Sequence, residues 1–495
     1  MRFLILISAL FLVELQASTL IKSDLSGNIV HGLYYIDITV GSQKNPAKMF
    51  LELANGVSYL NAKTCSGCSH ASSNPYDMNN STTMVPISCG SSLCTPNTCT
   101  TSDCAGDCHA STNACCAKNN KSLCGFSFGT ISQHSAYGSM IQENIMIQTT
   151  TGWSPSFPIY VGYLESAYGS IDSSDGLLGL SYQKFCNPSC FDNYFDSMIK
   201  NINGTKSMFT ICFGNTKGVL SYGGIDEDLY TGNITWIDIF LDGYYTLEVN
   251  DFRINGKSEP LYTLFDIGTT LILLQTDLFN SIKNYFQTNY CHLPYVCDKP
   301  NIFSDECLDD PPSSEWPTLD IYLNGVYLSL SPEVYFLKYT ENNTNYYCFG
   351  IRDIGHHGLD ANVFGATMMR AFTTIFDKEH DRIGIATPTS ACHLDVLGSI
   401  HKTTYKPSPP KDNTFIIIIL ISCLVFITLC SIVIIIKRHH SHRVPRLNGE
   451  HYTVKNVLIA QSRKNSEVQM LSKQQYEHST ETNMKTNLIP SNATI

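Results

Sequence analysis

Two segments some two hundred residues apart share one pattern and constrain how this chain can fold. In residues 262–274, Asp266 stands between two apolar runs and is followed by Ile267, Gly268 and two threonines. Residues 48–60 have the same apolar frame, but Ala54 stands where the later copy has its aspartate. Glycine in such a turn lets two backbone stretches approach closely. The two segments indicate an internal duplication in which one copy lacks the acidic group.

A second pair of segments supports the duplication. Leu177-Leu178-Gly179 follows the first turn and Val363-Phe364-Gly365 follows the second, in the same order and at a similar distance. Short apolar and β-branched runs, cut by Gly, Asn, Asp and Ser, fill residues 28–389 and predict a mainly β protein. Helical periodicity is clear at 276–286. A body of this length exceeds one ordinary core, so two lobes are expected.

The ends of the chain predict a single-pass membrane protein. Residues 1–17 have the basic start and short apolar core of a secretory signal peptide. Residues 415–436 are uncharged and apolar, long enough for a transmembrane helix. Basic residues follow at once, which places the tail 437–495 in the cytosol. We expect a lumenal or extracellular body in the secretory pathway or at the cell surface, a stalk at 393–414, and a tail without a folded core.

Cysteine usage fits that compartment. Eighteen of the 20 cysteines precede the apolar span, and ten of them lie within residues 65–124. An even number in an ectodomain predicts disulfides, and we expect neither a metal site nor a cofactor. Exposed N-glycosylation sequons are expected at Asn79, Asn80, Asn120, Asn203, Asn233 and Asn342. The net charge of −11 argues against nucleic acid as a partner.

The body resembles the pepsin-like aspartic peptidases over residues 28–389. Six segments match in family order: 34–41, 175–180, 220–226, 265–270, 362–365 and 370–386. The resemblance implies a bilobal, mainly β pepsin-like fold, with an N-terminal lobe at 28–200 that carries the cysteine-rich insert 65–124, and a C-terminal lobe at 201–392. It also implies a disulfide between Cys307 and Cys348. The insert and the C-terminal anchor look most like plasmepsin V-type membrane aspartic peptidases.

The resemblance also implies a chemistry that this chain lacks in part. Two aspartates in such enzymes share one proton and hold the water that attacks the peptide bond. Asp266 matches one of them, and Ala54 occupies the other position. The turn and cleft positions that match the family are Gly56, Gly268, Thr269 and Thr270, with Ile267 in place of a threonine. Phe128 is expected where the flap carries a tyrosine, and Tyr137 is the alternative match.

Glu52 lies two residues before Ala54 and on the same face of a strand. Two residues along an extended strand span about 6.5 Å. We therefore expect Glu52 to be too far from Asp266 to share a proton, and to be a strand residue that makes a polar contact.

Three functions fit these observations. The first is a membrane-anchored peptidase homologue with lost or strongly reduced proteolysis that binds a peptide or protein ligand in the old cleft. The second is an active aspartic endopeptidase of the same family. The third is a surface adhesion or receptor protein that works through the cysteine-rich block. Activity of the purified protein separates the first two, and binding by the isolated block favours the third.

Overall fold

The computed structural model describes residues 19–402 apart from residues 95–106, 110–113, 130–134, 169–173, 183–190, 242, 250, 253–260, 305, 324 and 356–360. The expected signal peptide, the apolar span 415–436 and the tail 437–495 lie outside the described residues. Within them, no helix is both long and apolar enough to cross a membrane.

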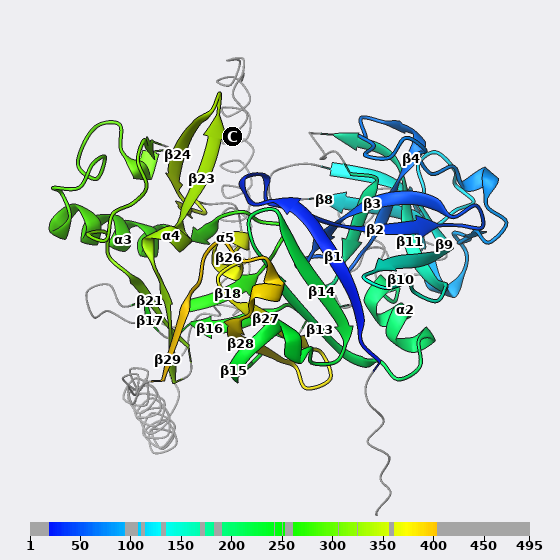
Figure 1. Cartoon of the computed structure of the whole chain (residues 1–495). Helices are drawn as coiled ribbons and strands as arrows, with labels where there is room; N and C mark the ends of the chain where they lie inside the picture. The colour runs from blue at the N-terminus through cyan, green and yellow to red at the C-terminus, as the bar shows by residue number, and fades with distance from the viewer. Residues whose placement is uncertain are drawn as a thin grey trace, which may run out of the picture. The chain divides into compact units, whose positions relative to one another are not determined.

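Strands dominate both halves of the described chain (Figure 1), and the expectation of a mainly β protein is confirmed. The first half contains β1 (Ile21–Asn28), η1 (Ile29–His31), β2 (Leu33–Val40), β3 (Asn45–Glu52), β4 (Tyr59–Ser66), η2 (Met78–Asn80), β5 (Val85–Pro86), η3 (Ser92–Cys94), β6 (Asp107–His109), β7 (Ala114–Cys116), β8 (Gly125–Gly129), β9 (Ser135–Thr149), β10 (Gly152–Trp153), β11 (Phe157–Tyr168), β12 (Gly176–Gly179) and α2 (Tyr194–Asn201).

The second half begins after α2. It contains β13 (Lys206–Phe213), β14 (Lys217–Gly223), η5 (Glu227–Leu229), β15 (Tyr230–Asp238), β16 (Thr246–Val249), β17 (Asp251–Phe252), β18 (Leu261–Phe265), β19 (Ile272–Leu274), α3 (Thr276–Asn289), η6 (Ile302–Ser304), β20 (Cys307–Leu308), β21 (Leu319–Leu323), β22 (Val326–Leu330), α4 (Pro332–Tyr335), β23 (Phe336–Glu341), β24 (Thr344–Phe349), β25 (Ile351–Asp353), β26 (Asn362–Phe364), α5 (Ala366–Met369), β27 (Thr373–Asp377), β28 (Arg382–Pro388), η7 (Ser390–Cys392) and β29 (Ser399–Lys402).

The internal duplication is visible in how the strands pair. In the first half, β12 pairs with β3 in parallel and with β4 in antiparallel orientation, so it lies between the two strands that flank the Ala54 turn. In the second half, β26 pairs in the same two ways with β18 and β19, which flank the Asp266 turn. Each turn is therefore held from behind by a strand that arrives much later in the chain.

Glycine stands at the end of β12 and directly after β26, because the turn backbone is too close for a side chain. A Cβ atom on Gly179 would lie 2.4 Å from the carbonyl oxygen of Asn55. A Cβ atom on Gly365 would lie 2.3 Å from the carbonyl oxygens of both Thr269 and Leu271. Real Cβ atoms do not approach backbone oxygens so closely, so any side chain here displaces the turn.

The two halves share one sheet. It contains strands from both, and β1 pairs with β14 at the junction, as Figure 1 shows near the middle of the view. The hydroxyl of Tyr34 in β2 donates to the carbonyl oxygen of Gly214 in the second half at 2.7 Å. Folded structure also extends beyond the expected lobe limits at both ends. β1 begins before residue 28, and β29 lies inside the expected stalk 393–414 and pairs with β22.

Disulfides connect distant parts of this body. Cys307 is bonded to Cys348, and Cys212 is bonded to Cys392. Cys291 is bonded to Cys297. Within the described part of the cysteine-rich insert, the structure pairs Cys65 with Cys68, Cys89 with Cys116 and Cys94 with Cys124.

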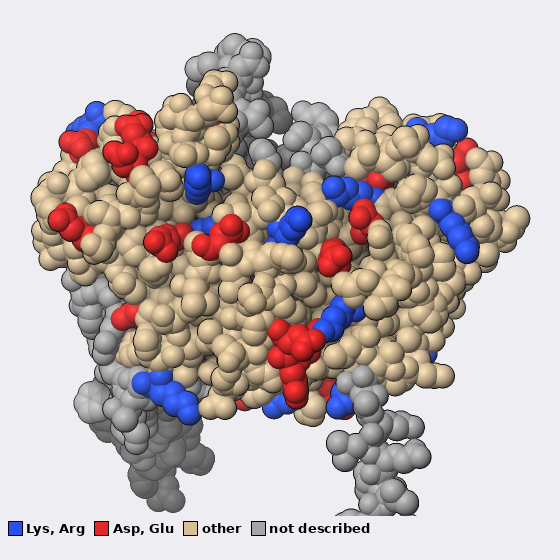
Figure 2. All heavy atoms as spheres, in the orientation of Figure 1, with Lys and Arg blue, Asp and Glu red and all other residues tan. Residues whose placement is uncertain are grey.

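Charged side chains of both signs are interspersed on the face in Figure 2, with uncharged surface between them. One mixed group is defined by ion pairs: Lys22 of β1 lies 2.9 Å from Asp226 and 2.8 Å from Asp228. These contacts join β1 to the segment around η5 and so add to the connection between the halves.

We predict that Gly365→Ala destabilises the protein by about 2 kcal/mol or more, because overpacking against fixed backbone costs this much. The φ of Gly365 is −78°, which suits any residue, so the cost arises from the close approach alone. Thermal unfolding of the full-length protein measures it. Gly90→Ala is the matched control, because a Cβ atom on Gly90 meets nothing within 4 Å. Equal melting temperatures for the two variants contradict the prediction.

Candidate functional site

Asp266 lies directly after β18 and is almost fully buried, with 5% of its surface exposed. Its Oδ1 accepts hydrogen bonds from the backbone amides of Gly268 at 3.0 Å and Leu53 at 3.3 Å. Its Oδ2 accepts from the hydroxyl of Thr269 at 2.8 Å. One of these donors comes from the other half of the chain, so the carboxylate connects the two duplicated turns.

The first turn, residues 53–58, lies against this carboxylate. The backbone amide of Ala54 also contributes to its stabilisation. Asn55 fixes the turn internally, because its Oδ1 accepts from the amide of Val57 at 2.9 Å. Gly56 is required by a close approach, since a Cβ atom there would lie 2.4 Å from the carbonyl oxygen of Tyr182. Ala54 and Asp266 are therefore brought together, with a methyl group where the second copy has its carboxylate.

The second turn is held by the helix that follows Gly365. The amides of Ala366 and Thr367 donate to the carbonyl oxygens of Thr269 at 2.7 Å and Thr270 at 2.8 Å. The side chain of Thr270 lies beside η1, since a Cβ atom on Gly32 would lie 2.2 Å from its Oγ1. Ile267 is fully buried, and its apolar side chain is part of the hydrophobic core.

Opposing effects set the pKa of Asp266. Burial raises the pKa above its ordinary value, since a charged carboxylate loses hydration in the protein. The donors from Thr269, Gly268, Leu53 and Ala54 lower it, because they stabilise the charged form. The net shift is upward, so burial is the larger effect.

Glu52 lies beside the second turn. A Cβ atom on Gly268 would lie 3.2 Å from Phe50 Cζ and 3.3 Å from both Asp266 Oδ1 and Glu52 Cγ, so Phe50 and Glu52 of β3 both lie close to Gly268. β3 ends at Glu52, and the chain bends at 53–54. Our expectation that Glu52 is too far from Asp266 to share a proton stays a prediction.

The environment of Glu52 raises its pKa to about 8. The larger cause is burial, and the negative charge of Asp266 adds to it. Part of the residue remains exposed to solvent, yet enough protein surrounds the carboxyl group to disfavour its charged form. Near neutral pH, Glu52 is therefore mainly a neutral carboxylic acid.

The expected flap corresponds to the β8–β9 hairpin. Phe128 lies in β8, and its backbone pairs with Ala136 in β9. Tyr137, the alternative match, lies in the opposite strand, where it pairs with Ser127. The side chain of Phe128 and residues 130–134 between the two strands lie outside the described part.

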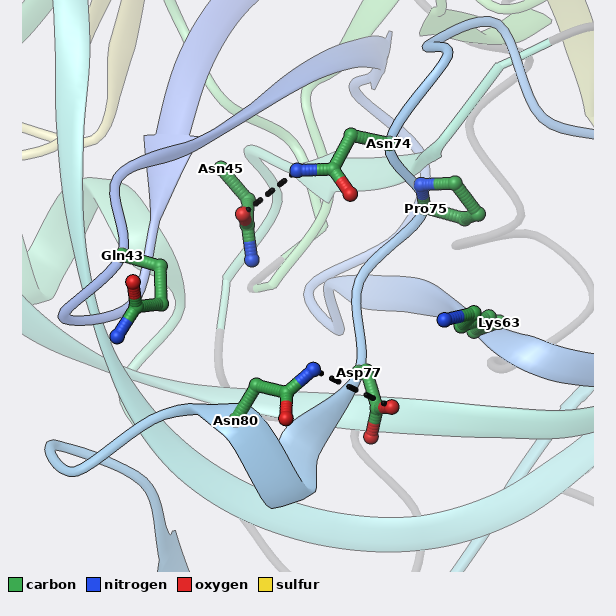
Figure 3. A pocket seen from close by; sticks show the side chains of 7 residues that line it. All are labelled: Gln43, Asn45, Lys63, Asn74, Pro75, Asp77 and Asn80. Atoms are coloured by element: carbon green, nitrogen blue, oxygen red, sulfur yellow. Dashed lines mark hydrogen bonds between the residues drawn. The ribbon is translucent and has the colours of Figure 1, made fainter.

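A separate polar pocket of about 530 Å³ lies in the first half (Figure 3), lined by Gln43, Asn45, Lys63, Asn74, Pro75, Asp77 and Asn80. The amide of Asn74 donates to Asn45 Oδ1 at 2.9 Å across one side of it. None of these residues belongs to the two turns. Among the residues that the structure describes, no group of three or more His, Cys, Asp or Glu side chains is arranged to hold a metal ion.

We predict that the stability of the protein falls as the pH rises from about 4.5 to about 8, the ordinary and the raised pKa of Glu52. The folded state holds the Glu52 proton more tightly than the unfolded chain does. The stability that this proton contributes is fully present below the ordinary pKa of glutamate and is lost as the pH rises through the raised pKa. The free energy of unfolding changes by at most about 1.4 kcal/mol per pH unit through this group. Glu52→Gln, which stays neutral, should flatten the profile and be more stable than the wild type near pH 8.

Chemical denaturation of the full-length protein at several pH values measures this effect. Glu341→Gln is the control, because Glu341 is exposed at the end of β23. A wild-type profile that Glu52→Gln leaves unchanged means that Glu52 does not carry the raised pKa.

The sequence of this chain is similar to sequences of known proteins. A sequence model described as eukaryotic aspartyl protease matches residues 33–388. The chain is 24% identical to gastricsin of Rattus norvegicus over 230 residues, which cover 43% of this chain and 54% of gastricsin. It is 24% identical to pepsin A of Bos taurus over 229 residues, 43% of this chain and 55% of that protein. The chain thus spans about half the length of the curated relatives it matches. The family match covers both turns, Asp266 included, and on that basis the chain belongs to the eukaryotic aspartyl protease family.

Proposed function

We propose that this protein is a membrane-anchored member of the family that binds extended peptide segments beside Asp266 and hydrolyses them far more slowly than a complete aspartate pair does. The observation that carries the proposal is the methyl group of Ala54 in the turn that faces Asp266. A methyl group neither accepts a proton from water nor donates one to a peptide carbonyl. Loss of one general acid–base group costs roughly 10²–10⁴-fold in rate.

The surroundings of Asp266 support retained binding. Ala54, Val57, Gly268 and Thr270 are partly exposed around the buried carboxylate, so both turns present surface to a ligand. The turns themselves are held by backbone hydrogen bonds that do not depend on residue 54. The β8–β9 hairpin supplies the backbone of a flap. A peptide binding site therefore survives the change from aspartate to alanine better than catalysis does.

The membrane orientation is part of the same proposal. Its support is the apolar run 415–436 with basic residues after it, together with the signal-like N-terminus. Disulfides fit an oxidising compartment. All six sequon asparagines, listed above from Asn79 to Asn342, are exposed and so accessible to glycosylation. The combination of anchor and cysteine-rich insert favours a plasmepsin V-type relationship within the family.

We predict that Ala54→Asp raises peptide cleavage by about 100-fold or more, since it restores a carboxyl group opposite Asp266. The gain should remain incomplete, because Ile267 still lacks a hydroxyl and catalytic groups that act together do not contribute additively. Full-length protein in detergent, incubated with a peptide pool at pH 4–6 and followed by mass spectrometry, measures the rates. Ala54→Asn, similar in size but without an acid, is the control. A wild type that cleaves as fast as Ala54→Asp refutes strongly reduced proteolysis.

Binding is measured separately with a statine-containing peptide, which carries a hydroxyl group in place of the scissile carbonyl. The wild type should bind it, and Ala54→Asp should bind it more tightly. If neither protein binds, the proposed peptide site is wrong even if the fold is right.

We predict that microsomes containing the full-length protein protect the body from added protease but expose the tail 437–495. Glycosidase treatment should lower the apparent mass, and substitution of single sequon asparagines by glutamine should lower it stepwise. A protein that is fully digested and unglycosylated contradicts the proposed orientation.

A further inference from the structure

The polar pocket in Figure 3, here called the η2 pocket, lies apart from Asp266 and has its own chemistry. Its volume of about 530 Å³ falls within the range of roughly 300–1,000 Å³ that small-molecule sites span. Its polar residues are four with amide side chains, one lysine and one aspartate: Gln43, Asn45, Asn74, Asn80, Lys63 and Asp77. Amides offer both donors and acceptors, and the two charges offset each other. The pocket therefore suits a neutral ligand that is rich in hydroxyl and amide groups.

The η2 pocket opens to solvent. Three of its residues, Asn45, Pro75 and Asp77, are half-buried, and the other four are exposed. The amide of Asn74 donates to Asn45 Oδ1 at 2.9 Å, so this part of the lining is fixed before any ligand binds. A small group can therefore lie in the pocket while the rest of a larger molecule extends into solvent.

Buried hydrogen bonds fix the segment 76–83, which contains η2 and forms one side of the pocket. Glu143 of β9 is fully buried and accepts from the hydroxyl of Tyr76 at 2.6 Å and from that of Thr83 at 2.5 Å. Tyr76 and Thr83 stand on either side of η2 in the sequence, so both ends of the segment are attached to one carboxyl group. The amide of Lys63 also donates to the carbonyl oxygen of Tyr76 at 2.9 Å. The shape of the pocket is thus held by the interior of the protein.

Asn80 is both a residue of this pocket and the asparagine of a glycosylation sequon, Asn80-Ser81-Thr82. Figure 3 shows its amide nitrogen directed toward Asp77, and Asn80 Nδ2 lies 3.5 Å from Asp77 Oδ2. Asn79 has an overlapping sequon but does not line the pocket. Successive residues of a 3-10 helix point about 120° apart, so groups attached to Asn79 and Asn80 start in different directions.

We propose that Asn80 carries an N-linked glycan and that the η2 pocket holds its first sugar. In the transfer, Asn80 Nδ2 forms a bond to C1 of the sugar and loses a proton, while the bond from C1 to the lipid pyrophosphate of the oligosaccharide donor breaks. Nδ2 keeps one hydrogen, which still donates to Asp77. The inference rests on the lumenal orientation in the proposed function and deepens it, because it gives one of the glycans a binding site on the protein.

Attachment to Asn80 makes modest contacts sufficient to hold the sugar. A ligand on a short tether has an effective concentration on the order of millimolar at its site, so its binding does not require high intrinsic affinity. Asn45 and Asn74 supply amide donors and acceptors for the hydroxyl and acetamido groups of N-acetylglucosamine. Pro75 supplies apolar surface for the acetamido methyl group.

The test follows the removal of glycans from the native full-length glycoprotein in detergent. An amidase that converts each glycosylated asparagine to aspartate is added, and mass spectrometry gives a rate for every site. Asn80 should react at least about tenfold more slowly than Asn233, because contacts equal to about two ordinary hydrogen bonds must open first. Asn233 is a suitable reference because it is exposed, and a Cβ atom on the adjacent Gly232 meets nothing within 4 Å. In the denatured protein the two sites should react at similar rates.

Variants locate the protection in the pocket. Asn74→Ala removes one amide from the lining and should raise the rate at Asn80 by about fivefold, the effect of one ordinary hydrogen bond. Asn289→Ala is the matched control, since Asn289 is also exposed and donates one side-chain hydrogen bond, to the carbonyl oxygen of Tyr285 at 2.8 Å. Asn79→Gln should keep the slowly released glycan, and Asn80→Gln should lose it. Thermal unfolding verifies that each variant is folded.

Carbohydrate of another molecule is the alternative occupant of the η2 pocket. Equilibrium dialysis of the glycosylated wild type with a labelled N-acetylglucosamine dimer distinguishes the two sources. We expect no saturable binding, because the sugar on Asn80 already fills the pocket. Saturable binding that Asn74→Ala removes means that the pocket serves a separate carbohydrate, which overturns the inference.

The inference is also overturned if Asn80 carries no glycan while Asn233 does, if the two native sites react equally fast, or if Asn74→Ala reacts no faster at Asn80 than the wild type. Failure of the proposed orientation gives a different result, in which none of the six sequons is modified. Failure of the proposed peptide site appears in statine-peptide binding, which the rates of glycan removal do not measure.

Discussion

The hydrogen bond from the Leu53 amide to the Asp266 carboxylate is the contact on which the site depends, because it joins the two duplicated turns. A buried carboxylate must regain the hydration that it loses, and here the replacement donors come from both copies of the motif. The glycines at 179 and 365 make this possible, since they allow β12 and β26 to press the turns into position. The fold thus uses close backbone contacts in both halves for the placement of one acid.

Ala54 leaves the donors of the first turn to Asp266. The backbone amides of residues 53 and 54 both act on the Asp266 carboxylate, and they lower its pKa against the effect of burial. The methyl group of Ala54 neither accepts these hydrogen bonds nor titrates. The first turn therefore supports the acid of the second turn without carrying an acid at its own matching position.

Much of this arrangement could be predicted from residue patterns. The two turn segments and the two apolar-glycine segments predicted which strands lie together, because close backbone approach requires glycine and buried strands require apolar runs. The β1 strand and β29 could not be placed in this way, since each pairs with a strand far away in sequence and carries mixed polarity. Strand spacing alone does not fix where the side chain of Glu52 lies, because this spacing applies only while the strand continues and β3 ends at Glu52.

Two acids of this region differ in how their charge is stabilised. Burial disfavours the charged form of Glu52, and the negative charge of Asp266 adds to that effect, so the pKa of Glu52 rises to about 8. Burial also raises the pKa of Asp266, but there the donors from Thr269, Gly268, Leu53 and Ala54 offset part of the effect. Two of these four donors belong to the first turn. The duplication therefore affects the charge of Asp266 directly, because the backbone of one copy stabilises the carboxylate of the other.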